Sequence, residues 1–184
     1  VAEFQDDILR GERQLQPLMA ARGQAPRWFR HPYLRAGQGQ ADKAAVVDFE
    51  LIDTSLEGEM RGPQAAEQAR LGLISDHLRE LLADSGRYEV VDIAPAAAEI
   101  EAAGHLHGCN RCEARIARGL GADLAIRGVV QKVSNLILNM TVFVADAETG
   151  EYVDGMTVDM RGNTDESWLR GVAYIVRHRL AEEE

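Results

Sequence analysis

The sequence predicts a mixed α/β domain in which helices pack on a mixed sheet of five strands. Stretches of alternating apolar and polar residues, typical of half-buried strands, are separated by segments with apolar residues at helical spacing. The last three strands follow one another with only short turns between them, so this part of the sheet is expected to be antiparallel. The chain has 184 residues and is 46% hydrophobic, which suits one domain with a core of its own.

The first expected strand covers residues 44–52, where apolar residues alternate with Asp48 and Glu50. A loop is expected from there through residue 63. A helix follows at residues 65–83, because its leucines and isoleucine recur every three or four positions and a Ser-Gly pair comes directly after it.

A short strand is expected at residues 88–91, followed by two short helices. The first begins at Pro95 and ends before Gly104, since proline favours the first helical position and glycine ends helices. The second covers residues 110–120. These helices separate the early strands from the final three, and a mixed sheet is therefore expected.

The final three strands are expected at residues 124–133, 136–146 and 152–161. The turn before the last strand contains a glycine, as a tight hairpin requires. Alternation in the middle strand directs five residues toward the helices: Leu136, Leu138, Met140, Val142 and Val144. The opposite face is expected to be partly free and to offer an interaction surface: Ile137, Asn139, Thr141 and Phe143.

The last helix is expected to begin at a capping pair formed by Asn163 and Glu166. Helical spacing gives it an inward face: Trp168, Val172, Ile175, Val176 and Leu180. The sheet is expected to pack against this helix around Trp168 and against the earlier long helix around Ile74.

The composition changes at residues 36–42, which contain two glycines and no large apolar residue. Such a stretch is typical of a linker. The sequence therefore predicts an N-terminal arm with its linker, residues 1–42, and one α/β domain, residues 43–184.

Within the arm, residues 7–12 and 27–34 resemble the later part of a polysaccharide deacetylase domain, and the likeness covers about residues 5–37. Members of that family bind a metal through a Thr-Phe-Asp-Asp-Gly run and a His-x-x-x-His motif, and the sequence contains neither. The resemblance therefore implies a remnant of such a domain, with a sugar-contacting arm as the alternative.

Four stretches of the α/β domain together resemble a bacterial family of predicted secreted proteins of unknown function: residues 47–55, 109–123, 130–137 and 159–168. The likeness covers nearly all of residues 43–180. It implies the fold above and a periplasmic or secreted location, but no activity. The order of elements is also similar to the N-terminal domain of the periplasmic Tol β-propeller protein, which is an analogy of fold alone.

The charge of the chain argues against a nucleic-acid partner, and its hydropathy argues against a membrane-spanning helix. The net charge of -10 argues against nucleic acid, because phosphate binding depends on lysine and arginine. No apolar run approaches the length of roughly 20 residues that a membrane-spanning helix needs. The expected partner is another protein or a second copy of the chain.

The densest group of reactive side chains is formed by His105, His107, Cys109 and Cys112, which lie within eight positions. Imidazole and thiolate groups bind zinc or copper, although this spacing is not that of a standard zinc finger. The cysteines alone also fit a redox pair or two free thiols. We favour a structural disulfide, in keeping with an extracytoplasmic location.

A second group of polar residues, Asp48, Glu50 and Asp53, lies on the first expected strand and at its end. Strand alternation places Asp48 and Glu50 on one face, where carboxylates could bind a hard cation such as Ca²⁺. The spacing does not match an EF-hand loop, so a solvated strand edge is favoured.

No common nucleophile, phosphate-binding or dinucleotide-binding motif is present, and an enzyme assignment has no residues to rest on. Two functions remain. The first is a non-catalytic extracytoplasmic accessory or binding module that needs no cofactor. The second is a metal-binding or redox protein that uses the histidine and cysteine loop, with zinc or copper as the metal.

Overall fold

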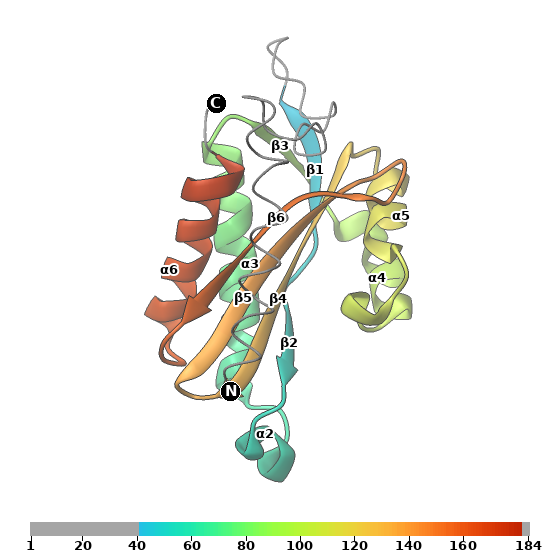
Figure 1. Cartoon of the computed structure of the whole chain (residues 1–184). Coiled ribbons are helices and arrows are strands. Elements are labelled where there is room, and N and C mark those ends of the chain that lie inside the picture. The colour runs from blue at the N-terminus through green and yellow to red at the C-terminus, as the bar shows by residue number, and fades with distance from the viewer. Residues whose placement is uncertain (1–40, 182–184) are drawn as a thin grey trace, which may run out of the picture. The chain divides into compact units, whose positions relative to one another are not determined.

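The computed structural model describes residues 41–181, and the deacetylase-like stretch lies outside the described residues. Figure 1 labels the helices and strands used below. Their order is β1 (Asp42–Val46), β2 (Glu50–Asp53), α2 (Leu56–Arg61), α3 (Ala65–Asp84), β3 (Tyr88–Val91), η2 (Ala94–Ala96), α4 (Ala97–Ala103), η3 (Leu106–Gly108), α5 (Cys112–Gly119), β4 (Leu124–Ser134), β5 (Ile137–Asp146), β6 (Tyr152–Met160), α6 (Asp165–Ile175) and η4 (Val176–Leu180).

The described strands form one mixed sheet, as the sequence predicts. Their order is β3-β1-β4-β5-β6, and β2 pairs with β4 off this path. β1 runs parallel to both β3 and β4, and β2 runs parallel to β4. β4, β5 and β6 form the expected antiparallel meander. The sheet has six strands where five were expected, because the first predicted strand is divided in two.

An extra residue divides that first strand. Val46 pairs with Ile126 and Glu50 pairs with Val129, so four steps along the first strand match three along β4. The backbone N–H of Phe49 leaves the ladder and donates to Ser75 Oγ at 2.9 Å. This break ends the regular alternation, so Asp48 and Glu50 do not share a face as predicted.

The core lies between one face of the sheet and the helices α3 and α6, which Figure 1 shows on the same side. The large apolar residues predicted to face inward on the last helix are all buried, and Trp168 is fully enclosed. Four of the five residues predicted for the inward face of β5 are also buried. Leu136 is the exception, because it lies in the β4–β5 turn and is 74% exposed.

Smaller residues fill the opposite side of the sheet, where α4 and α5 lie (Figure 1). One cluster there consists of alanines from β1, α5, β4, β5 and nearby loops, and a second contains Ile116, Leu106 and Cys112. Both helices were predicted. α5 begins at Cys112, two residues later than expected, and α4 ends before Gly104, whose φ of 66° suits a residue without a Cβ.

Two helix starts differ from prediction. The loop expected through residue 63 contains the short helix α2, whose N-cap Ser55 accepts a hydrogen bond from Gly58 N. α6 is capped by Thr164, which accepts from Ser167 N at 3.3 Å, so the Asn163 and Glu166 pair does not form its cap. The side chain of Asn163 has another role, given below. None of the described helices is both long and apolar enough to cross a membrane.

Candidate interaction site

A lysine lies at the centre of a buried group of charges where β2, β4 and the start of α3 meet. Lys132 is on β4 and its side chain is fully buried. Its Nζ lies 2.6 Å from Glu67 Oε1, 3.2 Å from Glu57 Oε2 and 3.3 Å from Asp53 Oδ2. We call these four residues the Lys132 cluster. One ammonium thus holds carboxylates from β2, α2 and α3.

Hydrogen bonds favour the charged forms of Lys132, Glu57 and Asp53. Burial alone would lower the pKa of Lys132, but the hydrogen bonds to Glu67 and Glu57 outweigh it, and the pKa lies above its usual value. The pKa of Glu57 is lowered by hydrogen bonds from Asn135 and Lys132. Burial acts to raise the pKa of Asp53, and hydrogen bonds from Ser55 and Lys132 reverse this into a lowered pKa. Lys132, Glu57 and Asp53 are therefore ionised at neutral pH.

Two asparagines extend the cluster to the β4–β5 turn and to the start of α6. Asn135 Nδ2 donates to Glu57 Oε2 at 2.8 Å, which links the turn to α2. Asn163 Nδ2 donates to Glu67 Oε1 at 2.6 Å and to Asn135 Oδ1 at 3.0 Å. Arg70 then connects Asn163 to Asp165 on α6. The turn, α2 and both long helices are thus joined at one end of the sheet.

This end of the molecule also exposes large apolar side chains. α2 presents Leu56 and Met60, which are four positions apart and so lie on one side of the helix. The β4–β5 hairpin presents Val133, Leu136 and Ile137. We call these five residues the α2–hairpin end. They comprise most of the strongly exposed large hydrophobic residues in the described part of the chain, and Figure 1 shows α2 and the hairpin at the same end of the sheet.

The interaction surface predicted on the free face of β5 is only partly open. Ile137 is exposed and belongs to the α2–hairpin end. Thr141 is half-buried, and its Oγ1 lies 2.8 Å from Thr157 Oγ1. Phe143 is half-buried between the guanidinium of Arg127, 4.3 Å from its ring centre, and the ring of Tyr152 at 5.4 Å. The accessible part of this face is therefore its Ile137 end.

The predicted acidic group does not form one cation site within residues 41–181, because each carboxylate has a different partner. Asp48 pairs with Arg79 on α3, which also donates to the Val46 carbonyl. Glu50 accepts hydrogen bonds from the η3 loop. Asp53 belongs to the Lys132 cluster. The break in the first strand separates Asp48 from Glu50, and the odd spacing of Glu50 and Asp53 along β2 directs these two to opposite faces.

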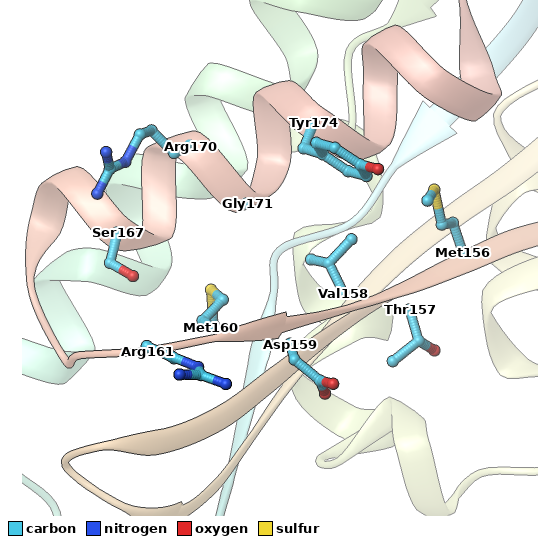
Figure 2. Close-up of a pocket in the computed structure, with 10 residues that line it drawn as sticks. All are labelled: Met156, Thr157, Val158, Asp159, Met160, Arg161, Ser167, Arg170, Gly171 and Tyr174. Atoms are coloured by element: carbon cyan, nitrogen blue, oxygen red, sulfur yellow. The ribbon is translucent and has the colours of Figure 1, made fainter.

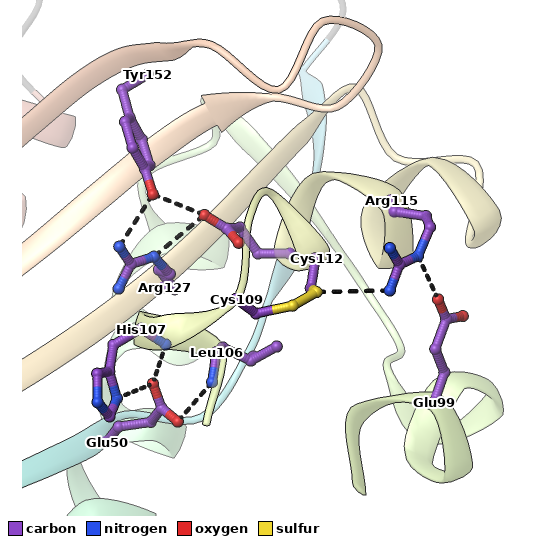
Figure 3. The surroundings of a disulfide bond; sticks show 10 residues. Glu50, Glu99, Leu106, His107, Cys109, Cys112, Arg115, Arg127 and Tyr152 are labelled. Atoms are coloured by element: carbon purple, nitrogen blue, oxygen red, sulfur yellow. Dashed lines mark hydrogen bonds and ion pairs between the residues drawn. A yellow bond between two sulfur atoms is a disulfide. The ribbon is translucent and has the colours of Figure 1, made fainter. Parts of the chain in front are cut away.

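Cys109 and Cys112 form a disulfide at the start of α5 (Figure 3), with their Cα atoms 5.7 Å apart. The two sulfurs are therefore not available as free thiolate ligands. Figure 3 also shows Glu50 beneath the preceding η3 loop, beside His107. His107 Nδ1 lies 3.1 Å from Glu50 Oε2, and His105 Nδ1 lies 3.6 Å from Glu50 Oε1. The structure thus separates the predicted four-residue group into a disulfide and two histidines that face a carboxylate.

A pocket of about 600 Å³ lies between the edge strand β6 and α6 (Figure 2). Met156, Arg170 and Tyr174 are among the residues that line it, and the strand has no partner on this side within the described sheet. The lining mixes apolar side chains with charged ones. No group of residues with catalytic spacing was predicted here, and we assign no chemistry to the pocket.

Lys132 was not predicted as a site residue, although the sequence contains a signal for it. Its position continues the period-two alternation that buries Ile126 and Val130 on the same face of β4. A lysine at such a position must have carboxylate partners. Those partners could not be named, because they come from segments 65 to 79 residues away in the chain and from a helix that was not predicted.

Comparisons with known proteins give one family match and several distant structural similarities. No curated protein matches the sequence. The C-terminal domain of LpoB from Salmonella enterica has 17% identity and a TM-score of 0.49, covering 68% of this chain and 87% of that one. The lipoprotein GNA1162 from Neisseria meningitidis has 14% identity and a TM-score of 0.46, covering 74% and 94%. The PelC dodecamer from Paraburkholderia phytofirmans has 16% identity and a TM-score of 0.44, covering 76% and 89%.

At these identities and TM-scores, the structural similarities carry no argument about function or partners. The comparisons give no evidence for the deacetylase resemblance, and they do not show the similarity to the Tol propeller domain. The family match is extensive, since the model of a family described as "Protein of unknown function (DUF2380)" covers residues 42–180. This fits the resemblance to a family of unknown function, and the chain belongs to that family.

Proposed function

We propose that this protein is a non-catalytic accessory module of the bacterial cell envelope that binds a protein partner through its α2–hairpin end. The observation that supports this function is the exposure of large apolar side chains on two elements that are linked by the hydrogen bond from Asn135 to Glu57 and by the ion pair of Glu57 with Lys132. Exposed apolar groups gathered at one site are typical of interaction surfaces. The exposed fractions of Met60 and Leu136 are 76% and 74%.

The form of this end favours a macromolecular partner over a small ligand. Sites for small molecules are concave and enclose their ligand. Here the apolar residues lie on a short helix and on a hairpin turn, two elements at the tip of the sheet (Figure 1). Side chains presented in this way can insert into a groove of another protein, as apolar anchor residues do in many interfaces.

The Lys132 cluster supports the same proposal by fixing the positions of the anchors. Glu57 lies next to Leu56 on α2, and Asn135 lies next to Leu136 in the turn, and these two polar side chains are hydrogen-bonded to each other. Ordering flexible side chains and loops on binding costs free energy, and a preformed surface avoids much of that cost. A rigid base under exposed apolar residues is therefore suited to binding.

An extracytoplasmic location is part of the proposal. Disulfides persist in oxidising compartments and are rare in the cytosol of most organisms. Cys109 and Cys112 form such a bond here. The thiols should therefore be oxidised in the living cell, which can be checked by trapping free thiols with an alkylating reagent before lysis. Two alkylated cysteines per chain would contradict an envelope location.

Site-specific photocross-linking in cells tests the binding surface. A photoreactive residue in place of Met60 or Leu136 should yield the same protein adduct, identified by mass spectrometry. The matched control is Leu73, an exposed leucine on α3. It should give no such adduct. Adducts that are absent at Met60 and Leu136, or equally strong at Leu73, would contradict the proposal; an adduct of two copies would make the partner a second chain.

A further inference from the structure

Three potential metal ligands meet at the η3 loop, near the first residue of β2, whereas α2 follows the last residue of that strand. They are Glu50 on β2 and His105 and His107 in and beside η3. One ligand atom from each residue lies within 4.8 Å of those of the other two. The two imidazoles approach the same carboxylate through the same kind of nitrogen, since both Nδ1 atoms face Glu50 at 3.6 Å and 3.1 Å.

The carboxylate of Glu50 is held in place by the backbone of the loop. The N–H of Leu106 donates to Oε1 and the N–H of His107 donates to Oε2, both at 2.8 Å (Figure 3). Each oxygen of a carboxylate has a second acceptor site, so these bonds orient the group and leave it able to coordinate a cation. Outer hydrogen bonds of this kind orient metal ligands in many sites.

The loop itself is anchored between the two histidines and directly after them. Leu106, which lies between them, is buried in the small core beneath α5. The Cys109–Cys112 disulfide follows directly after η3. The side chain of His105 is 82% exposed, so its ring can rotate without disturbing the core. Ligand atoms about 2.0 to 2.2 Å from a common ion lie within about 4.4 Å of one another, which requires only a small adjustment of this free ring.

An ordinary ion pair between histidine and glutamate explains this arrangement less well. A salt bridge joins one ring to one carboxylate, but two rings face Glu50 and their centres are only 5.3 Å apart. A metal ion accepts a nitrogen from each ring together with a carboxylate oxygen, so one bound ion explains the positions of all three side chains.

We propose that Glu50, His105 and His107 bind one zinc ion, with a coordination position left open to water. Two imidazole nitrogens and one carboxylate oxygen suit borderline metals such as Zn²⁺, whereas Ca²⁺ takes six to eight oxygen ligands. This donor set replaces the predicted set of two histidines and two cysteines, because the disulfide removes both thiolates and Glu50 supplies the third ligand.

Calorimetric titration of the full chain with zinc chloride tests the site. We expect one zinc ion per chain and no binding of calcium chloride. His105→Ala and His107→Ala should each weaken zinc binding by more than about tenfold, since even outer partners of metal ligands contribute about 10- to 100-fold. His77→Ala is the matched control, because this histidine also lies near a glutamate, Glu80 at 3.9 Å, but belongs to no group of three such ligands within residues 41–181. It should bind zinc as the wild type does.

A second variant and a second readout separate the site from the alternatives. Cys109→Ser/Cys112→Ser should still bind zinc, and cobalt should give a visible absorption band that His107→Ala loses while its circular dichroism remains that of the folded protein. The proposal is overturned if the wild type takes up no zinc, or if His105→Ala/His107→Ala binds it unchanged. It is also overturned if zinc binding is lost in the cysteine variant and retained in the histidine variants.

Discussion

Strand β2 carries two carboxylates three residues apart, and the protein compensates their charges in different ways. Asp53 lies beside Lys132, a fully buried group whose raised pKa keeps it charged at any physiological pH. Glu50 lies beside two imidazoles and two backbone N–H groups. Glu50 therefore contacts imidazole rings and loop backbone, whereas Asp53 contacts a buried ammonium.

Asp53 therefore has a structural role, whereas Glu50 belongs to a proposed binding site. A permanently charged lysine joins β2, α2 and α3 into a rigid base, on which the exposed apolar residues of the α2–hairpin end are placed. At Glu50, the neighbouring side chains are two imidazoles that can act as metal ligands, and this is where we propose a zinc ion. Substitutions at Lys132 and at Glu50 test these two roles separately.

The largest effect is expected on the Asp53 side. Lys132→Met should lower the free energy of unfolding by about 3 to 5 kcal/mol, because it leaves buried carboxylates without their cation. Chemical denaturation measures this. Lys43→Met is the matched control, since Lys43 is the other lysine of the chain and takes no part in the cluster. Equal losses in the two variants would remove the special role of Lys132.

A smaller effect is expected on the Glu50 side. Glu50→Gln keeps one oxygen acceptor for the loop but loses the charge, so the free energy of unfolding should fall by about 1 to 2 kcal/mol. The measurement is the same denaturation, carried out without metal. A loss as large as that of Lys132→Met would show that both carboxylates are structural, and the contrast between the two ends of β2 would disappear.

Acid should reduce the difference between the wild type and Lys132→Met. In the folded protein the pKa values of Asp53 and Glu57 are lowered from their usual values of 3.8 and 4.5. The two carboxylates therefore stabilise the folded protein fully above those usual values, and this stabilisation is lost as the pH falls through the lower folded pKa values. In Lys132→Met the same carboxylates gain from protonation. Unfolding curves from pH 7 to pH 3 should therefore converge. A constant difference over that range would contradict the assigned partners.

The sequence predicted the fold well where the spacing of apolar residues within one helix or strand is enough to identify its buried face. The period of α3, the inward face of α6 and residues 138–144 of β5 follow from spacing alone. It failed where a single residue changes the register. The extra residue before Glu50 divided the first strand, and the turn without glycine around Leu136 was taken as part of β5.

The candidate sites were predicted less well, because their residues are joined only by the tertiary structure. Cys109 and Cys112 are close in sequence, and the favoured disulfide is the bond that the structure contains. Glu50 lies 57 positions from His107, so sequence spacing could not show that this carboxylate replaces the cysteines beside the histidines. The exposed α2 residues were missed because a helix of six residues has too few turns to show a period.

In our proposal the α2–hairpin end serves binding and contributes little to folding. Its most direct test is the variant Met60→Gln/Leu136→Gln, with unfolding and photocross-linking from the Ile137 position measured side by side. Both replaced side chains are exposed, so the free energy of unfolding should change by less than about 0.5 kcal/mol, while the adduct of the wild type should be lost. An unchanged adduct, or a loss of stability comparable to that of Lys132→Met, would contradict the claim.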